Sequence, residues 1–444
     1  MEWLGEVPEH WGVKKIAHVA DLIAGFAFPS EQFEFDPESG IPLVRGDNVT
    51  EGWLRWGEKG RYWPFGLEYE KRYLLEENDI VIQMDGSKVG KNWAIVGKAD
   101  LPALLVQRVT RVRVAEAVPR FIYSLFSNEM FVRYVDRAKT DPAIPHITMK
   151  NIGDYWIPMP PHSEQIAITC FLDRETAKID ALVAEQRRLI ELLKEKRQAV
   201  ISHAVTKGLN PHAPMKPSGV EWLGDVPEHW RVMRVKHLTR SIEQGWSPQC
   251  EGFPVETENE WGVLKVGCVN GGTFNSNENK VLPPDLEPIP ELGISFGDLL
   301  ISRANTRELV GSAAVAAMDY PRLLLCDKLY RLRLKPDLGL PTHLSHYLGS
   351  NAAREQIELG ATGASASMVN IGQSVILELK LAVPPIDEQH SIVATLGRDT
   401  AKLDALTVEA QRAIDILQER RTALISAAVT GKIDVRGLVN TEVA

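Results

Sequence analysis

The sequence lacks the features that would tie a chain to a membrane or to an oxidising compartment. No apolar run in its 444 residues approaches the ~20 residues that cross a bilayer. The start, Met1-Glu2-Trp3, has no basic-then-apolar signal region. The 4 cysteines form no C-x-x-C pair, so neither a disulfide framework nor a zinc ribbon is expected. We therefore expect a cytoplasmic protein without a metal site.

A basic excess and recognisable catalytic motifs are missing as well. The net charge of -9 argues against a protein that coats nucleic acid without discrimination. Cationic residues nevertheless cluster locally, as at Lys88 and Lys91 and from Arg108 to Arg113; a solvated surface would explain such clusters too. There is no P-loop, no paired glycine loop after a strand and no Asn-Pro-Pro-aromatic motif.

What the chain does contain is a repeat of domain size. Residues 3–11 return with few changes as residues 222–230, 219 positions later, and both copies run from Trp-Leu-Gly to His-Trp. Pro160-Pro161-His162-Ser163-Glu164-Gln165 returns as Pro384-Pro385-Ile386-Asp387-Glu388-Gln389, 224 positions later. The ends of the repeat are therefore shared. The 5-residue difference in offset falls inside the globular parts, which vary.

The globular parts mix strand and helix signals. Asp79–Ile82, Ala94–Val96 and Val109–Val114 have the composition of strands, and residues 85–90 have that of a turn. A helical pattern follows from Arg120 to Val135. The second repeat has the same order, with strands near 298–301, 313–317 and 329–334 and a helix around 344–358. The predicted class is α+β.

Each globular part is followed by one long helix with a heptad-like seam, from about 163 to 206 and again after Pro384. The predicted seam residues are Ile168, Leu172, Ile179, Leu182, Leu189, Leu193, Ile392, Leu396, Leu403, Leu406, Leu417 and Leu424. Charges interrupt both seams at matching places, Glu175 with Asp399 and Lys196 with Arg420. They either set the register or face water where the helix curves.

The order of parts predicts how the helices pair. The termini of a domain usually lie close together, so the end of the first helix should meet the start of the second. The helices should then form an antiparallel coiled coil with pseudo-two-fold symmetry. About 40 residues per helix make a rod of roughly 60 Å, long enough to hold two modules over separate segments of one DNA duplex.

These motifs, together with the helix ends at Ile201–Thr206 and Ile425–Thr430, resemble the specificity subunit of type I restriction-modification systems over essentially the whole chain. The resemblance implies two target recognition domains, 1–159 and 211–383. A central conserved helix (160–210), a distal conserved helix (384–436) and a short tail (437–444) complete the chain.

The resemblance further implies a non-catalytic subunit that reads the two halves of a bipartite, asymmetric target in double-stranded DNA. Its implied partners are two adenine methyltransferase subunits and nuclease/translocase subunits, with no membrane contact. S-adenosylmethionine, ATP and Mg are expected on those partners and no cofactor on this chain. Two alternatives stay open: a coiled-coil scaffold with protein-binding end domains, and a stand-alone restriction-modification enzyme.

Reading bases in the major groove requires side chains such as Arg, Lys, Asn and Gln on loops or strand edges. The candidates in the first repeat are Gln83, Ser87, Lys88, Lys91, Asn92, Gln107 and Arg108. Those in the second are Ser302, Arg303, Asn305, Thr306, Arg307, Lys328 and Arg331. Each could equally be a phosphate contact or a solvated loop residue.

An aromatic stretch distinguishes the first repeat from the second. Aromatic and cationic residues alternate from Trp53 to Tyr73, which favours either core packing with a wet rim or stacking on bases. The matching stretch of the second repeat, Gly271–Asn277, is polar. The two repeats are therefore expected to read different half-sites.

Overall fold

The computed structural model describes residues 5–140, 145–257, 259–365 and 368–438. The chain divides into two compact units. Unit 1 comprises Met1–Arg187 with Gln411–Ala444, and unit 2 comprises Arg188–Ala410. Each unit therefore combines one globular part with a part of each long helix.

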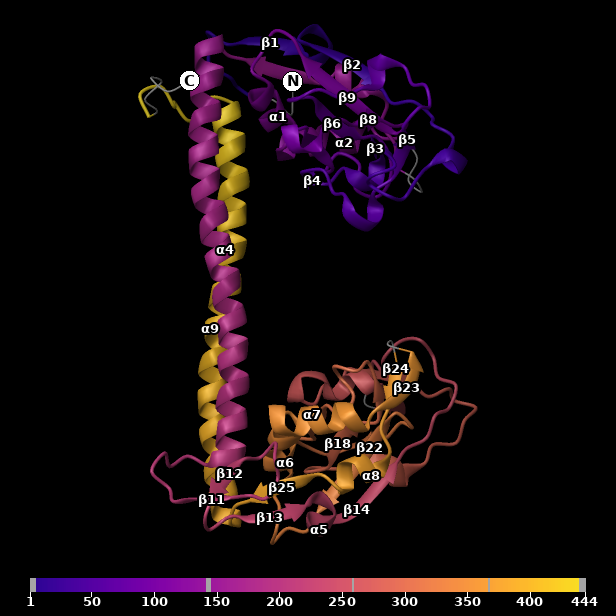
Figure 1. Cartoon of the computed structure of the whole chain (residues 1–444), viewed down its shortest axis with the longest axis vertical. Helices are drawn as coiled ribbons and strands as arrows, with labels where there is room; N and C mark the ends of the chain where they lie inside the picture. The colour runs from indigo at the N-terminus through magenta and orange to yellow at the C-terminus, as the bar shows by residue number, and fades with distance from the viewer. Residues whose placement is uncertain (1–4, 141–144, 258, 366–367, 439–444) are drawn as a thin grey trace. The chain divides into compact units, whose positions relative to one another are not determined.

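The globular part of unit 1 is built on two sheets (Figure 1), with strand orders β2-β9-β6-β7-β4 and β5-β3-β8. The strands are β2 Ala20–Ala24, β3 Gly40–Val44, β4 Glu51–Gly52, β5 Tyr62–Pro64, β6 Ile80–Gln83, β7 Trp93–Ile95, β8 Leu104–Leu105 and β9 Val109–Val114. β1 (Gly12–Lys15) pairs separately with β10 (Trp156–Met159). The helices are α1 Pro119–Phe126, α2 Glu129–Ala138 and α3 Met149–Gly153.

Unit 2 repeats this plan, with sheets β14-β22-β18-β20 and β16-β15-β21-β17. The strands are β14 Thr239–Gln244, β15 Gly262–Leu264, β16 Asn279–Val281, β17 Gly293–Ile294, β18 Leu299–Ser302, β20 Ala313–Val315, β21 Tyr320–Leu324 and β22 Leu329–Leu334. Smaller sheets join β13 Arg231–Arg234 to β25 Lys380–Val383, β11 Met215–Pro217 to β12 Asp225–Pro227, and β19 Ala304–Asn305 to β24 Met368–Asn370 and β23 Thr362–Ser365. The short helices are α5 Val235–Leu238, α6 Pro341–Leu348, α7 Asn351–Gly360 and α8 Gln373–Leu377. The predicted α+β class is confirmed.

The central strand of each unit separates two cores. In β6, Ile80 and Ile82 face the core that includes the helices, and Val81 faces the core beneath the smaller sheet. In β18, Leu299 and Ile301 face the helices while Leu300 faces the smaller sheet. Successive side chains of a strand point to opposite faces, so a strand that is apolar at every position is buried on both.

The helical segment expected at Arg120–Val135 is two helices, α1 and α2. The break occurs because Asn128 caps the second helix: its Oδ1 accepts hydrogen bonds from the backbone N–H groups of Met130 (2.8 Å) and Phe131 (3.3 Å). In unit 2 the helix expected around 344–358 is likewise divided into α6 and α7, with Gly349 and Ser350 between them.

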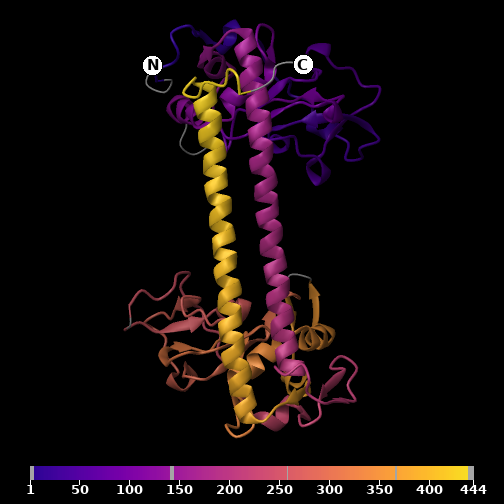
Figure 2. The ribbon, with the colours of Figure 1, turned by 90° about the vertical axis from the view of Figure 1, so that its left-hand side faces the viewer.

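The two long helices are α4 (His162–Lys207) and α9 (Ile386–Val429), which confirms the predicted helical segments. Ile168 and Leu172 share a core with Ile425 and Val429 in unit 1. Ile201 and Ala204 share one with Ile392 and Leu396 in unit 2. Within each unit, the two helices therefore run antiparallel (Figure 2).

The buried line along each helix departs from the predicted heptad seam. In α4 it passes through Ile168, Leu172, Thr176, Ile179, Val183, Gln186, Ile190, Leu193, Arg197, Ile201 and Ala204, and in α9 through the residues 224 positions later. Ten steps cover 36 residues in each case, or 3.6 residues per step. That is the period of a straight α-helix, whereas a heptad seam advances 3.5 residues per step. The predicted seam residues Leu182, Leu189 and Leu406 are consequently exposed. Leu417 lies on the line and is half-buried, as is Leu424 beside it.

The departure from the predicted seam also changes which charged residues lie between the two helices. Arg197 and Arg421 occupy the half-buried positions predicted for Lys196 and Arg420, which are exposed. Arg421 Nε donates to Asp180 Oδ1 (3.0 Å) in unit 1, and Arg197 Nε lies 3.2 Å from Asp404 Oδ1 in unit 2. These are one interaction made twice, since both residues of the second pair have counterparts 224 positions away in the first. The ion pairs match only in the antiparallel register.

The Glu-Gln dipeptide that starts each long helix ties three segments together. In unit 1, Glu164 Oε2 accepts the indole N–H of Trp11 (2.8 Å) and lies 3.0 Å from His10 Nε2. Gln165 accepts the backbone N–H of Val118 and donates to the carbonyl of Pro160 (2.9 Å each). The repeated opening and the repeated helix entry are therefore two parts of one junction.

Unit 2 rebuilds this junction with the matching residues, except that the buried indole N–H of Trp230 has no hydrogen-bond partner among the described residues. His229 Nε2 lies 2.8 Å from Glu388 Oε2. Gln389 accepts the N–H of Leu340 (2.8 Å) and donates to the carbonyl of Pro384 (3.0 Å).

Each opening also packs on the end of the other repeat's helix, as its recurrence suggests. Gly431 follows α9 with φ +73°, and a Cβ there would come within 2.5 Å of Pro8 and 3.1 Å of Trp11. Gly208 follows α4 with φ +79°, and a Cβ at this position would lie 3.2 Å from the Trp230 ring. Glycine is required at both helix ends by conformation and by the close approach of the opening. The predicted burial of Trp11 is confirmed, and Trp3 lies outside the described residues.

We expect Glu164→Ala to lower the stability of unit 1 by about 1–3 kcal/mol, because the buried Trp11 indole N–H then has no acceptor. Thermal unfolding of the full chain measures the change. Glu191→Ala is the matched control: it removes an exposed carboxylate of the same helix that pairs with Lys194 and should cost about 0–1 kcal/mol. Equal effects of the two variants would show that the junction does not stabilise the unit.

Unit 2 should lose stability in mild acid because of two histidines in α6. Burial lowers the pKa of His343 and of His346 from 6.5 to about 4. The folded state holds both rings neutral while the unfolded chain protonates them, so stability is complete above pH 6.5 and declines as the pH falls toward 4.

The matching position in unit 1 suggests the control variant for this pH effect. His343 corresponds to Phe121, the third residue of α1 as His343 is of α6. We expect His343→Phe to reduce the loss of stability between pH 6.5 and pH 4, measured by urea unfolding. An unchanged pH profile would rule out His343 as a source of the acid sensitivity.

Candidate nucleic-acid interface

The candidate residues of unit 1 lie at one end of the larger sheet. β6 and β7 are antiparallel neighbours, and β9 begins opposite the end of β6, where Val109 pairs with Gln83. The loop between β6 and β7 therefore lies beside the turn that precedes β9. The fold brings together all seven candidates of the first repeat, which the sequence separates by up to 25 positions.

Within this cluster some side chains are held and others are free to solvent. Asn92 donates its side-chain N–H to Gln83 Oε1 (2.6 Å), so these two side-chain amides form a hydrogen-bonded pair. Arg108 has φ +69° and lies 3.1 Å from Asp85. Ser87, Lys88, Lys91 and Gln107 are exposed. The arrangement offers a paired amide, which suits adenine, flanked by cations that suit guanine or phosphate.

In unit 2, the candidates group around the end of β18 and the start of β22. Thr306 and Arg307 are exposed, and Arg303 and Lys328 are half-buried. Asn305 is largely buried: its side chain accepts the N–H of Thr306 (2.9 Å) and donates to Asn270 (3.3 Å). Ser302 is buried, and its hydroxyl has no hydrogen-bond partner among the residues described. Ser302 and Asn305 thus shape the loop and present little surface to a ligand in this conformation.

The two units hold these residues with the same backbone hydrogen bonds. The N–H of Met84 donates to the carbonyl of Arg108 (2.9 Å), and that of Arg303 donates to the carbonyl of Lys328 (2.8 Å). Ile147 N–H donates to Met84, and Ile371 N–H donates to Arg303, in the same way. The frame is shared while the side chains mounted on it differ.

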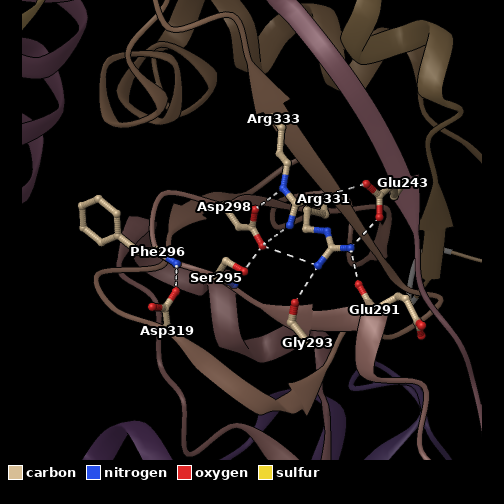
Figure 3. A network of polar contacts seen from close by, with 9 residues as sticks. All are labelled: Glu243, Glu291, Gly293, Ser295, Phe296, Asp298, Asp319, Arg331 and Arg333. Carbon is tan, nitrogen blue, oxygen red and sulfur yellow. Dashed lines mark hydrogen bonds and ion pairs between the residues drawn. The ribbon is translucent and has the colours of Figure 1, made fainter.

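Arg331 must be withdrawn as a DNA-reading candidate. It is 1% exposed, and its guanidinium donates to the carboxylate of Glu243 and to the carbonyls of Gly293 (2.7 Å) and Glu291 (2.9 Å) (Figure 3). Its side chain faces the smaller sheet because β22 alternates, whereas the sequence-based expectation placed it at an accessible edge. The corresponding residue of unit 1, Arg111, is also buried and donates to Asp21 and to the Arg72 carbonyl.

A buried carboxylate completes this network. Asp298 accepts from Arg333 Nε (2.7 Å) and from the N–H of Ser295 (3.0 Å). The hydrogen bond to Asp298 raises the pKa of Arg333. Asp79 and Arg113 form the same pair in unit 1, where Asp79 raises the pKa of Arg113. The network is therefore part of the common frame and lies at the end of the strands away from the candidate loops.

Arg354 in α7 holds the loop of unit 2, although it was not among the sequence-based candidates. It donates to the backbone carbonyls of Val310, Glu308 (3.0 Å) and Arg307 (3.3 Å). An isolated arginine in a helix carries no sequence signal for such a role.

A glycine in each unit lets the loop approach a helix closely. Gly311 has φ +77°, and a Cβ there would lie 2.6 Å from the side chain of Ile357 in α7. Gly90 and Val135 make the same approach in unit 1 at 2.8 Å. The position of the loop on the helix is therefore another feature that the two units share.

The aromatic stretch of unit 1 serves mainly as core. Tyr62, Trp63 and Tyr73 are buried, with Trp63 and Tyr73 in the core beneath the smaller sheet. Trp53 and Phe65 are exposed. Tyr69 is exposed as well. This distribution is the core with an exposed rim, one of the two alternatives, and it leaves three exposed rings of the kind that stack on bases.

Comparison with known proteins shows what the chain is similar to. The family model described as "Type I restriction modification DNA specificity domain" matches residues 8–192. The EcoKI specificity subunit of Escherichia coli is 23% identical over 97% of this chain and 90% of its own length. The EcoEI specificity subunit of the same species is 28% identical over 54% of this chain, which spans 40% of that relative.

A solved structure shares the fold. A chain from work on complex assembly and conformational transition of the type I R-M system superimposes with a TM-score of 0.71 at 17% identity, covering 96% of this chain and all of that one. At this identity the likeness concerns the fold. Residues 8–192 thus match the type I DNA specificity domain, and over nearly its whole length the chain is similar to specificity subunits of type I restriction enzymes.

Two kinds of feature are absent from the described part of the chain. No helix in the described ranges is both long and apolar enough to span a membrane. Within those same ranges, no group of His, Cys, Asp and Glu is arranged to hold a metal ion.

Arg331→Met should destabilise unit 2 by about 3 kcal/mol, since removing one member of a buried ion pair leaves its partners unsatisfied. Thermal unfolding tests this, with Arg307→Gln as the control because Arg307 is an exposed arginine of the same unit. The structural assignment fails if Arg331→Met unfolds like the original chain but changes the DNA sequence that is recognised.

Proposed function

We propose that this chain reads the two halves of a bipartite, asymmetric target in double-stranded DNA and docks the adenine methyltransferase and nuclease/translocase subunits of a type I restriction-modification complex. One observation carries the proposal. Matching backbone hydrogen bonds in the two units support different exposed side chains at the same end of the sheet: Lys88 and Gln107 in one, Thr306 and Arg307 in the other.

A shared frame with exchanged side chains is what a reader of two unequal half-sites needs. The frame fixes where the loops meet a groove, and the side chains decide which base edges they fit. The side chains of Gln83 and Asn92 form an amide pair, whereas in unit 2 Ser302, which matches Gln83, is buried and the exposed candidates are Thr306 and Arg307. The target should therefore not be a palindrome.

The docking of partners is supported by exposed apolar side chains at matching positions of the long helices. Leu182 is 45% exposed and Leu406, its counterpart, 53%; Leu192 is 51% exposed and Ile416 55%. Apolar side chains left exposed on a helix favour a protein partner. Because the positions recur 224 residues apart, we infer two copies of the same partner. The helix pair as a whole would act as an antiparallel, pseudo-two-fold coiled coil between the two target recognition domains.

Chemistry is assigned to the partners in this proposal. This chain would perform none and bind no cofactor, while S-adenosylmethionine, ATP and Mg would be held by the methyltransferase and nuclease/translocase subunits. The role left to this chain is to choose the sequence and hold the complex together.

Mapping of N6-methyladenine in cells that carry the partner genes tests the proposal. We expect a split motif that disappears when the gene for this chain is deleted. Gln83→Ala combined with Asn92→Ala should alter or abolish recognition of one half of that motif, because the amide pair belongs to unit 1. Arg303→Ala with Arg307→Ala should affect the other half.

Two results would contradict the proposal. Methylation that persists unchanged after deletion, with the partner genes active, would exclude a role in target choice. A chain that binds the partner subunits but leaves their DNA selection unaltered would favour a protein scaffold instead.

A further inference from the structure

Three lysines of unit 2 surround one small cavity beside the candidate DNA loop. The cavity measures about 170 Å³, and its lining includes Lys265, Lys280 and Lys328. Liquid water takes about 30 Å³ per molecule, so there is room for a phosphate group and a few waters. Lys328 belongs to the predicted DNA-reading set, whereas Lys265 and Lys280 come from the smaller sheet.

The fold explains why the lysines meet. β15 and β21 run parallel, with Val263 beside Leu324, so the residues after each strand leave the sheet at the same end. Lys265 follows β15, and Lys328 follows β21 after a short turn. Lys280 lies in β16 opposite Val263. Residues that the sequence separates by 15 and 48 positions are thus brought to one cavity.

The charge around this cavity is not balanced within the chain. Asp327 is the single carboxylate in the lining, and none of the three lysines forms an ion pair with another described residue. Two thiols, Cys250 and Cys326, also line it. Burial raises the pKa of Cys326 to about 11 and raises that of Cys250, so neither thiol supplies a negative charge at neutral pH. Three cations then face one anion.

The cavity adjoins the candidate reading loop directly. The carbonyl of Lys328 accepts the backbone N–H of Arg303 (2.8 Å), which places the lysines next to the segment that carries Thr306 and Arg307. The loop and the cavity are therefore neighbours on the surface of unit 2.

We propose that Lys265, Lys280 and Lys328 form an anion site that holds a backbone phosphate of the DNA bound by unit 2. This rests on the proposed function and assigns a separate task within it. The lysines anchor the duplex irrespective of sequence, and the loop beside them reads bases. An ammonium group suits a phosphate as a point charge, and phosphate contacts position a duplex without carrying sequence information.

Unit 1 places cations at the two corresponding positions, with a different outcome. Arg45 follows β3 as Lys265 follows β15, and Arg108 precedes β9 as Lys328 precedes β22. Arg45, however, donates to the Lys59 carbonyl (3.2 Å) and lies 3.9 Å from Asp47, and burial lowers its pKa. Its charge is partly satisfied inside the unit. The anion site is therefore assigned to unit 2.

The test uses the complex of the full chain with its methyltransferase subunits and a duplex that contains the mapped target. Lys265→Gln combined with Lys280→Gln should weaken binding. The slope of log affinity against log salt should fall by about 0.9 for each phosphate that the variant no longer neutralises. When the salt concentration rises from about 50 to 200 mM, the ratio of the original affinity to the variant's affinity should therefore change roughly 3-fold for each phosphate lost. The methylated motif should stay the same.

Two further variants separate charge from structure. Lys335→Gln is the matched control, because Lys335 is exposed and follows the far end of β22; it should leave the salt slope unchanged. Lys265→Arg keeps the positive charge and should retain most of the affinity. Thermal unfolding of each variant checks that the unit still folds.

The outcomes are distinguishable. If the unaltered complex neither binds nor methylates a defined target, the proposed function itself fails. If it does, but the lysine variants keep the original affinity and salt slope, the anion site is wrong. A changed motif in the half read by unit 2 would also overturn it, since the lysines would then be reading bases.

Discussion

The junction at the start of each long helix is the interaction on which the rest of the structure depends. A single Glu-Gln dipeptide joins the opening of the repeat, the first turn of the helix and the loop that enters α1 or α6. The buried hydrogen bonds of Glu164 and Gln165 fix the angle between helix and globular part, because an unsatisfied polar group there would cost free energy. Glycine at the end of the opposite helix lets the opening pack closely on it. Each unit thus clamps the beginning of one long helix and the end of the other.

The pairing of the helices follows from the same arrangement. Asp180 with Arg421 and Asp404 with Arg197 make one ion pair in two places, which is possible only when the helices are antiparallel and in this register. Exposed ion pairs contribute little stability; their value here is that a shifted register would separate both. The helices are held together mainly by the side chains of the buried line. Their 3.6-residue period keeps one face of each helix toward its neighbour.

Those parts of the fold that depend on local pattern could be predicted from the sequence. β9, β22 and the two long helices were predicted close to their observed bounds because apolar periodicity and turn residues are local signals. The heptad assignment failed at Leu182, Leu189 and Leu406, since leucines lie near both a 3.5-residue and a 3.6-residue line and the sequence does not say which line is buried. The predicted single helix of unit 1 is divided at Asn128 because side-chain capping competes with continuation. In unit 2 the Ser350 hydroxyl instead donates to the carbonyl of Tyr347 at the end of α6.

The sequence by itself determined that this protein is a duplication with common ends and differing middles, and which loops carry the residue types that favour DNA contact. Those conclusions require only composition, spacing and recurrence. The tertiary structure decided which candidates are accessible, because accessibility depends on which face of a strand meets a second sheet. Arg331 is buried against Glu243. Lys265 and Lys280, which no sequence pattern singled out, line one cavity together with Lys328. Parallel pairing of distant strands, which no local pattern records, brings those charges together.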